Sequence, residues 1–583
     1  MKRILIHLIC FACFGSCWCQ TDSKQTTILL NDQWKFRTGD NLHWANNDFE
    51  DSSWDSISTK QYWEEQGYED YNGYGWYRKS FVIPVELIQR INQSGGLYLK
   101  YDYADDVEEV FINGVSIGMM GEFPPNLKIE YGKSRKFRIP AELIKYDTDN
   151  LIAIRVYDDG SKGGLLSDTF SMNPISTMDD LNLKVEVKSP DWIFINDEEI
   201  SFNVSLRDTI MQPLDFNLIC KITTDDYIPV DSLSYSIQCN LFENFEQNVH
   251  VKVSNSGFYR LTLYGDINGL ASDQIKFNIG YNPEKIISTP DPKPDFDTFW
   301  QQSLAELKQI APNFKMVLLK DKSNDKKDVY HVSMHSLGDV IIEGYYAVPK
   351  DKSRKYPVVI TFLGYGGSSA PLNPDNWSGY CEFVLSTRGQ GIQLENNKYG
   401  DWLTSGLESK ESYYYRGAFM DLIRGLDFLS SRGEIDKEKI FAEGGSQGGA
   451  FTLAACALDN RIKAAAPYMP FLSDFSDYFR IAPWPRDVFA TYLKNNSDKD
   501  WEYVYDLLSY FDMKNLAEKI KCPIIMGIGL QDNVCPPHIN FAIYNQIKSE
   551  KKYYVYPNKA HSAGDGWWDE RNTFFNKFIN EKK

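Results

Sequence analysis

The sequence Gly444-Gly445-Ser446-Gln447-Gly448-Gly449 lies between an apolar run at residues 440–442 and an apolar helical pattern at residues 450–458. This order predicts a strand, a sharp turn and a helix. A serine on such a turn projects its hydroxyl at the carboxyl edge of a sheet, and the glycines let strand and helix approach closely. The pattern favours Ser446 as a nucleophile, with a glycine-rich turn that carries no chemistry as the alternative.

Two later residues stand where the partners of a serine nucleophile are expected. A serine hydroxyl needs a base within hydrogen-bond reach and a group that orients this base. Asp532 follows the apolar strand that ends near Ile528, and His561 follows the next predicted strand. The chain order Ser, Asp, His is that of α/β-hydrolases. We therefore predict Ser446, Asp532 and His561 as a catalytic triad, in preference to a loop aspartate and a structural histidine.

Acyl transfer also needs hydrogen-bond donors for the oxyanion, and rigidly held backbone amides serve this purpose well. The amide of Gln447, directly after the nucleophile, is one candidate. The predicted strand at residues 358–362 is followed by a glycine-rich loop, Leu363-Gly364-Tyr365-Gly366-Gly367. We choose Tyr365 as the second donor, and an ordinary glycine-rich loop is the alternative for this residue.

The C-terminal half, residues 282–583, alternates strands with helices, which predicts a mostly parallel sheet covered by helices. A proline-rich linker at residues 290–294 precedes its first helix, which Asp295-Phe296-Asp297 caps. Its length suits one enzyme domain, whereas the whole chain of 583 residues is too long for one core. We expect an α/β-hydrolase domain over residues 282–583.

The N-terminal half reads as two β-sandwiches. Residues 26–175 show short strands with turns, including Asn113-Gly114, a strong hairpin signal between two apolar runs. Residues 181–281 show alternating strands at the spacing of an immunoglobulin-like sandwich. We predict a jelly roll, then an immunoglobulin-like domain that acts as a rigid connector. The expected fold class is two β-sandwiches followed by an α/β-hydrolase.

The net charge and the N-terminal leader limit which partners and which location are expected for this protein. The net charge of -18 and pI near 5.0 argue against nucleic acid or an anionic membrane surface as partner. Residues 1–19 read as a signal peptide cleaved after Cys19, and acylation of Cys17 is the alternative. No other stretch is long and apolar enough for a membrane helix. We expect a secreted or periplasmic protein without an integral membrane segment in the mature chain.

Cysteines and histidines outside the leader predict neither a stapled fold nor a metal site. Six cysteines remain, of which Cys220 and Cys239 could pair, while the other four lie in apolar contexts. His331 and His335 fall on a predicted strand, where four residues span about 13 Å, too far for one ion. We expect no metal and no cofactor.

Several motifs in residues 282–583 resemble those of the acetyl xylan esterase and cephalosporin-C deacetylase family, carbohydrate esterase family seven. They are F-L-G-Y-G-G at 362–367, T-R-G-Q-G at 387–391, Y-Y-Y-R at 413–416, G-S-Q-G-G at 445–449 and D-N-V-C-P-P at 532–537. The resemblance implies a metal-independent serine esterase that removes acetyl groups from xylan, xylo-oligosaccharides and small acetylated molecules. Ser446, Asp532 and His561 match the family's triad, and Tyr365 and Gln447 match its oxyanion donors.

A second resemblance covers most of residues 26–175. The segments W-K-F at 34–36, G-Y-G-W-Y-R-K-S-F at 73–81 and V-F-I-N-G-V-S-I-G at 110–118 are similar to the galactose-binding-like jelly roll of family 2 glycoside hydrolases and sialate esterases. Such modules resemble sugar binders but often serve only as spacers. Glycan binding by this domain therefore stays open.

These patterns together predict a secreted serine esterase that acts on an acetylated polysaccharide or oligosaccharide through an acetyl-enzyme. Two alternatives remain: a prolyl-oligopeptidase-type serine peptidase, and a glycan-binding protein with an inactive hydrolase domain. Trp402, Trp567 and Trp568 could border a sugar subsite, and helix packing explains each about as well. The polysaccharide and the oligomeric state stay open.

Overall fold

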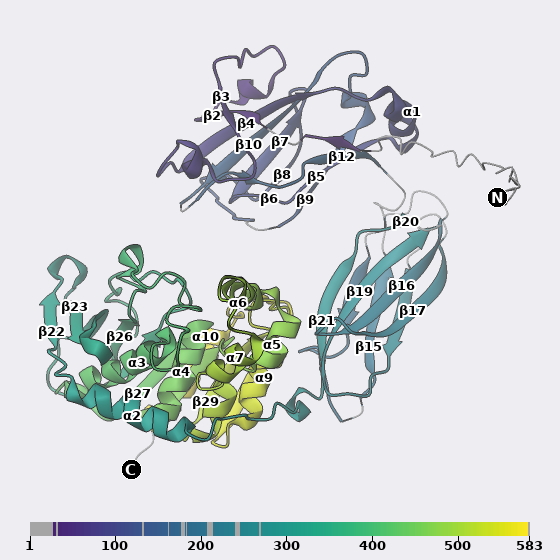
Figure 1. The fold of residues 1–583 in the computed structure, drawn as a ribbon. Coiled ribbons are helices and arrows are strands. Elements are labelled where there is room, and N and C mark those ends of the chain that lie inside the picture. Colours follow the sequence, from purple (N-terminus) through teal and green to yellow (C-terminus); the bar gives the residue numbers. More distant parts are fainter. Residues whose placement is uncertain are drawn as a thin grey trace, which may run out of the picture. The chain divides into compact units, whose positions relative to one another are not determined.

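The structure is a computed structural model that describes residues 27–580, except 31–32, 131–132, 161, 176–180, 182, 197, 207–213, 240–244 and 268–269. The predicted signal peptide, with Cys17, lies outside these residues. The chain divides into two compact units, Met1–Asp180 and Leu181–Lys583. The first is mainly β, and the second holds a β-sandwich and an α/β domain (Figure 1).

The first unit is a sandwich of two antiparallel sheets. The six-stranded sheet has the order β3 (Asp55–Ile57), β2 (Trp34–Thr38), β4 (Gly73–Phe81), β10 (Asn150–Asp158), β7 (Val107–Ile112) and β8 (Val115–Met120). The other has the order β1 (Ile28–Leu29), β12 (Ser171–Pro174), β5 (Gly96–Tyr101) and β9 (Arg135–Pro140). The pair β6 (Tyr103–Ala104) and β11 (Leu165–Leu166) and helix α1 (Val85–Ser94) complete this unit.

Aromatic side chains fill the core of this sandwich. Trp34, Phe36, Trp63 and Tyr77 are all buried, and the ring centroids of Phe36 and Tyr77 lie 4.8 Å apart. Strand β4 alternates between this core and a second, smaller aromatic cluster that contains Trp76. Much of the aromatic content of this region therefore packs inside the domain.

The second unit begins with another sandwich. Its five main strands run in the order β14 (Ile193–Phe194), β21 (Ile275–Tyr281), β19 (Gly257–Ile267), β16 (Leu214–Thr224) and β17 (Pro229–Cys239), and β20 (Leu270–Ala271) pairs with β19. The facing sheet has β13 (Lys184–Val187), β15 (Ile200–Leu206) and β18 (Phe245–Val251). This arrangement is that of a two-sheet sandwich in which each inner face supplies half of the core.

The register of this sandwich corrects the suggested pairing of Cys220 with Cys239. In the antiparallel pair of β16 and β17, Cys239 lies opposite Leu214 and Cys220 lies opposite Leu233. The two cysteines are therefore about six residues apart along the ladder, or roughly 20 Å, well beyond disulfide reach. Both are buried, and neither is in a disulfide.

A nine-stranded sheet forms the α/β domain. Its order is β22 (Lys315–Leu318), β23 (Lys327–His335), β24 (Ile341–Pro349), β26 (Cys381–Ser386), β25 (Tyr356–Phe362), β27 (Ile435–Gly445), β28 (Ile462–Tyr468), β29 (Ile524–Gly529) and β30 (Lys551–Tyr556). The strands from β26 to β30 pair in parallel, and β22 to β24 are antiparallel. The carboxyl ends of the parallel strands thus share one edge.

Helices cover both faces of this sheet, as Figure 1 shows. The helices are α2 (Phe296–Gln309), α3 (Tyr414–Ser431), α4 (Gln447–Leu458), α5 (Phe475–Ile481), α6 (Pro483–Asn495), α7 (Trp501–Leu508), α8 (Met513–Leu516), α9 (Pro537–Gln546) and α10 (Trp567–Asn580). Val358 and Ile360 of β25 join the core with α3 and α4, while Val359 joins the cluster with Phe575 of α10. Apolar residues on both faces explain the unbroken apolar runs of these strands.

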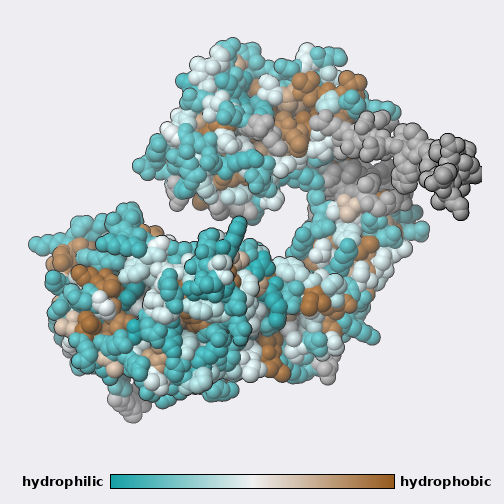
Figure 2. Space-filling view, viewed as in Figure 1, coloured by the Kyte–Doolittle hydropathy of each residue, from teal (hydrophilic) through white to brown (hydrophobic). Residues whose placement is uncertain are grey.

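The surface of this domain is largely hydrophilic, with apolar surface over the end of the sheet formed by β22 and β23 (Figure 2). Val317 and Leu318 of β22 and Ile341 of β24 are exposed there. Within the described residues, no helix is long and apolar enough to cross a membrane. The predicted fold class, two β-sandwiches followed by an α/β-hydrolase, is confirmed. The predicted domain boundaries stay predictions.

Candidate active site

The turn of Ser446, the predicted nucleophile, lies at the carboxyl edge of the sheet, between β27 and α4. Ser446 has φ 57° and ψ -124°. This backbone conformation is strained for a residue with a Cβ, and such strain persists only where the surroundings fix it. Its amide donates to Tyr468 O at 3.0 Å, and its carbonyl accepts from Phe471 N at 3.1 Å. Contacts on both sides therefore hold the serine in this conformation.

Two glycines allow strand and helix to meet around the serine. A Cβ on Gly444 would lie 2.4 Å from Gly448 O, and a Cβ on Gly448 would lie 2.1 Å from Phe362 O. Both distances are far inside van der Waals contact. The backbone approach that produces the turn thus requires glycine at both positions, as the sequence pattern predicts.

Asp532 and His561 come together at the same edge, after β29 and β30. Asp532 is 1 % exposed, and its Oδ1 accepts from the amides of Val534 and Cys535, both at 2.8 Å. Its Oδ2 lies 2.7 Å from Nδ1 of His561. A carboxylate only accepts, so Nδ1–H is the donor and Nε2 is left as the basic nitrogen. This is the geometry of an oriented general base.

The hydroxyl of Ser446 lies against the loop that carries Asp532. It contacts the thiol of Cys535, which Tyr478 also contacts. Burial, followed by the charge of Asp532, raises the pKa of the Cys535 thiol well above its usual value, so the thiol stays protonated. Among the described residues no hydrogen bond joins Ser446 to His561. Nucleophile and base often tighten only when substrate binds.

The predicted oxyanion loop follows β25 and lies beside the nucleophile. A Cβ built on Gly364 would lie 4.0 Å from the Cβ of Ser446. The next residue, Tyr365, donates its hydroxyl to Asp401 Oδ1 at 2.8 Å. Its ring packs edge-on against Trp402 and Trp484, with centroids 4.9 and 5.7 Å away. These side-chain contacts fix the loop that presents the Tyr365 amide.

Gln447 begins α4, where backbone amides have no partner in a preceding turn. Its buried side chain is fixed at both ends: Nε2 donates to Gln390 Oε1 and Oε1 accepts from the Tyr415 hydroxyl, both at 2.9 Å. Gln390 in turn donates to Tyr414, whose hydroxyl donates to the carbonyl of Arg388. Both ends of the Gln447 side chain are thus engaged in structural hydrogen bonds. Its backbone amide is the group that can donate to an oxyanion.

Arg388 anchors the far end of this buried chain. Its guanidinium donates to both oxygens of Asp421, from Nε at 2.9 Å and from Nη2 at 2.7 Å. Its amide donates to the same carboxylate at 3.0 Å. In the sequence, the R-G-Q-G part of the motif at 387–391 indicated only the family resemblance, and what it supports was missed. The signal was the glutamine of this motif, which reaches the residue after the nucleophile.

One group among the described residues has the spacing of metal ligands: Asp474, Asp477 and His538. Its ligand atoms already have partners. Lys514 Nζ lies 3.3 Å from Asp474 Oδ1, and the nitrogens of His538 lie 2.8 Å from Asp225 and 3.2 Å from Asp477. The donor set, with an ammonium inside it, fits an ion-pair network and not a cation site. His331 and His335 lie on β23, as predicted.

The tryptophans considered for a sugar subsite differ in exposure. Trp567 and Trp402 are buried, whereas Trp568 is 43 % exposed. Trp568 packs against Tyr468, whose carbonyl accepts from the Ser446 amide, and Arg571 lies over its ring. Packing therefore accounts for Trp567 and Trp402, and the exposed face of Trp568 is the part left for a ligand.

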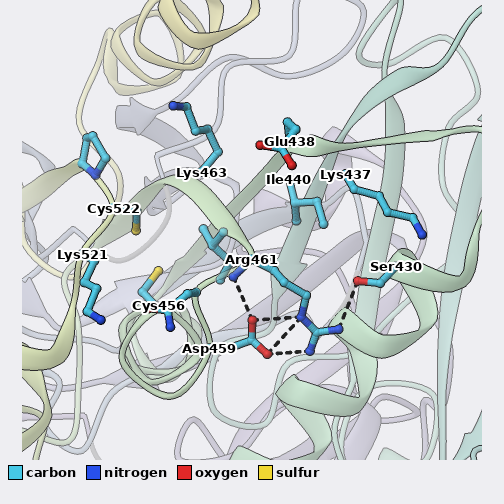
Figure 3. Close-up of a pocket in the computed structure, with 13 residues that line it drawn as sticks. Ser430, Lys437, Glu438, Ile440, Cys456, Asp459, Arg461, Lys463, Lys521 and Cys522 are labelled. Carbon is cyan, nitrogen blue, oxygen red and sulfur yellow. Dashed lines mark hydrogen bonds and ion pairs between the residues drawn. The ribbon is translucent and has the colours of Figure 1, made fainter.

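A cavity of about 510 Å³ lies at the opposite, amino end of the sheet. Figure 3 shows its lining, in which Arg461 faces Asp459 and Ser430, and the thiols of Cys456 and Cys522 turn toward one another. These residues flank the ends of α4 and β28 that are remote from Ser446. The cavity is therefore separate from the triad residues.

The sheet order, the strained serine turn and the aspartate–histidine pair define an α/β-hydrolase. Residues 281–578, just over half of the chain, match the family model described as acetyl xylan esterase, and residues 38–162 match the second all-β domain of β-galactosidases. The chain belongs to the acetyl xylan esterase family. It is a carbohydrate acetylesterase.

Individual relatives agree with this assignment. Acetyl esterase Axe7A of Xylanibacter ruminicola is 27% identical over 321 residues, which are 52% of this chain and 71% of that protein. The acetyl xylan esterase of Paenibacillus sp. R4 is 31% identical, with 51% of this chain and 98% of that chain covered and a TM-score of 0.48. Acetyl xylan esterase 1 of Thermoanaerobacterium sp. JW/SL YS485 is 28% identical at the same coverage and TM-score. The resemblance predicted from the motifs is confirmed.

Proposed function

We propose that this protein is a serine esterase that removes acetyl groups from xylan-type polysaccharide or oligosaccharides through an acetyl-enzyme. The observation that carries the proposal is the meeting of three features at one sheet edge. These are the strained turn of Ser446, the buried carboxylate of Asp532 and the bond of that carboxylate to His561. The family assignment supports the acetyl group and the carbohydrate as substrate features.

In this mechanism, Ser446 Oγ attacks the acetyl carbonyl carbon while His561 Nε2 takes the hydroxyl proton. The amides of Gln447 and Tyr365 donate to the oxyanion. The intermediate collapses, the bond to the sugar oxygen breaks, and the imidazolium returns its proton to this leaving oxygen. Water then attacks the acetyl-enzyme with His561 as base, and acetate leaves as Ser446 regains its proton. Asp532 keeps the imidazole in the required tautomer throughout.

The experiment that tests the mechanism compares wild type and Ser446→Ala in hydrolysis of p-nitrophenyl acetate. Removal of the nucleophile is expected to lower kcat by about 10⁴-fold or more, with the unfolding temperature nearly unchanged because alanine keeps the Cβ and so the same backbone strain. Equal rates of hydrolysis by wild type and Ser446→Ala would contradict the serine mechanism. Acetylated xylan, pectin and mannan, compared by acetate release, then identify the polymer.

The two other functions make different predictions. A prolyl-oligopeptidase-type peptidase would cleave a proline-containing peptide anilide and leave acetylated xylan intact. A glycan-binding protein with an inactive hydrolase domain would turn over neither substrate. The intact pair of Asp532 and His561 favours the esterase over the inactive protein.

We also propose that the enzyme is exported, either secreted or periplasmic. The support is the leader at residues 1–19, with Lys2 and Arg3 before an apolar run. Polymeric xylan is found outside the cell that degrades it, so export matches the proposed substrate. Mass spectrometry of the mature N-terminus would distinguish cleavage after Cys19 from acylation of Cys17.

A further inference from the structure

The edge of the immunoglobulin-like domain contacts the loop that carries Asp532. Strand β21 pairs with β19 on one side, while the short β14 covers its other side only at Gly280 and Tyr281. At Asn278 this open side is filled by Gln531, the residue before the acid. The amide of Asn278 donates to Gln531 Oε1 at 2.8 Å, and Gln531 Nε2 donates to Asn278 O at 3.2 Å. The side chain of Gln531 thus satisfies both backbone groups, as a neighbouring strand would.

The same side chain also reaches the loop that carries the histidine. Gln531 Nε2 donates to Pro557 O at 2.7 Å, and the amide of Gln531 donates to Lys559 O at 2.9 Å. Asn278 Nδ2 adds a bond to Leu530 O at 3.1 Å. One glutamine therefore joins three segments: the edge of the sandwich, the acid loop and the base loop.

The interface around this contact is well packed. Phe258 of β19 packs against Phe541 of α9, with ring centroids 5.7 Å apart, and Phe258 belongs to the same hydrophobic core as the α/β domain. His538, also in α9, bridges Asp225 of the sandwich and Asp477 of α5. Hydrophobic packing and an ion-pair bridge hold the two domains as one body, so the sandwich edge is a fixed support for the loop.

We propose that the immunoglobulin-like domain is part of the support of the catalytic centre, and that Asn278 and Gln531 are positioning residues for Asp532 and His561. The inference rests on the proposed function, because it takes Asp532 and His561 as acid and base. Without the side-chain amide of Gln531, the acid loop loses its bonds to the Asn278 backbone and to Pro557 O together, and only Asn278 Nδ2 still bonds it to the sandwich edge. A displacement of about 1 Å between catalytic groups costs about 100-fold in rate.

The test uses full-length Gln531→Leu, which keeps the side-chain size and removes its hydrogen bonds. Its matched control is Gln546→Leu in α9, because Gln546 Nε2 donates to the Ser288 carbonyl at 2.8 Å in the interdomain linker, away from both loops. With p-nitrophenyl acetate, we expect Gln531→Leu to lower kcat about 10- to 100-fold with KM nearly unchanged. Gln546→Leu should keep the wild-type kcat even where it lowers Tm as much.

A second variant, Asn278→Ala, removes the side-chain donor to Leu530 without adding a charge and keeps the backbone bonds of Asn278. It should lower kcat less than Gln531→Leu, again without a change in KM. The positioning role is overturned if Gln531→Leu keeps the wild-type kcat, or if Gln546→Leu loses as much kcat at an equal loss of Tm. Either outcome would make the interface merely structural.

Two further variants separate this inference from the proposed function. Ser446→Ala and Asp532→Asn are expected to lose nearly all esterase activity. If both remain active, the serine mechanism itself fails. If both are inactive while Gln531→Leu matches wild type in kcat, the mechanism stands and only the positioning role is wrong.

Discussion

The two ends of the parallel sheet are built from similar residues and differ in how those residues are used. At the carboxyl end, Arg388 binds Asp421 with two bonds, both side chains nearly excluded from water. At the amino end, Arg461 binds both oxygens of Asp459, from Nε to Oδ1 and from Nη2 to Oδ2, beside an open cavity. Only the first pair continues through buried hydrogen bonds to the nucleophile turn. An arginine–aspartate pair of this geometry therefore contributes to the site only where it is buried and hydrogen-bonded to the residues that hold the Ser446 turn.

The difference between the two pairs can be tested by replacing each arginine in turn, beginning with the buried Arg388. Arg388→Met should lower the free energy of unfolding by about 3–5 kcal/mol, because Asp421 is left as an uncompensated buried charge. The chain through Gln390 to Gln447 should loosen with it, so kcat should fall as well. Urea unfolding and p-nitrophenyl acetate kinetics measure the two effects. A stable, fully active variant would refute the assigned role of the pair.

The glycine of the turn offers a sharper probe of the carboxyl end. Gly448→Ala places a Cβ 2.1 Å from Phe362 O in the present backbone, and overpacking of this kind costs about 1–3 kcal/mol. The strand and helix must move apart, which displaces Ser446. We therefore expect a larger loss of kcat than the loss of stability alone would produce. The control is Gly433→Ala, where a Cβ meets nothing within 4 Å. Thermal unfolding and kcat are measured for both variants. Equal Tm and equal kcat in the two variants would contradict the requirement for glycine at 448.

Much of this carboxyl end could be predicted from the sequence, because its signals are local. The glycines around Ser446 encode the turn, and the chain order of Asp532 and His561 follows from the fold class. Register could not be read in this way, so the sequence left open whether Cys220 pairs with Cys239, and the ladder shows that they lie too far apart.

Contacts across hundreds of residues also left no sequence signal. Gln531 meets Asn278 through backbone groups of a strand edge, and any residue at 278 offers those groups. The contact between the Ser446 hydroxyl and Cys535 depends on how two loops meet. Such partners are set by the packing of domains and loops, which only the structure reveals.

The support of the carboxyl end by the sandwich has a pH dependence. Burial alone lowers the pKa of His538, but its hydrogen bonds and charge pairing with Asp225 and Asp477 outweigh this and raise the pKa to about 10. Because the folded pKa lies above the unfolded one, the stabilisation is complete below about pH 6.5. It is lost as pH rises toward 10. Arg480 and Asp226 face the same junction.

The corresponding prediction compares wild type with Asp225→Asn in urea unfolding at pH 6, 8 and 9.5. Wild type should lose more stability over this range, with a difference of about 1–2 kcal/mol, since each unit of pKa shift corresponds to about 1.4 kcal/mol. The variant, which lacks one carboxylate partner, should show a flatter curve. Parallel curves would show that His538 does not hold its proton at the interface.

The smallest effect is expected at the amino end of the sheet. Arg461 is partly exposed, with 31% of its side chain accessible, and it also binds Ser430 Oγ at 3.0 Å. Water can replace the lost bonds in Arg461→Met, so stability should fall by no more than about 1 kcal/mol. Because none of these contacts leads to Ser446, kcat and KM should match wild type. This variant is measured beside Arg388→Met. The comparison tests whether burial and connection to the turn give Arg388 its effect on kcat, or whether bidentate pairing is enough. An equal loss of kcat in both variants would reject the explanation by burial and connection.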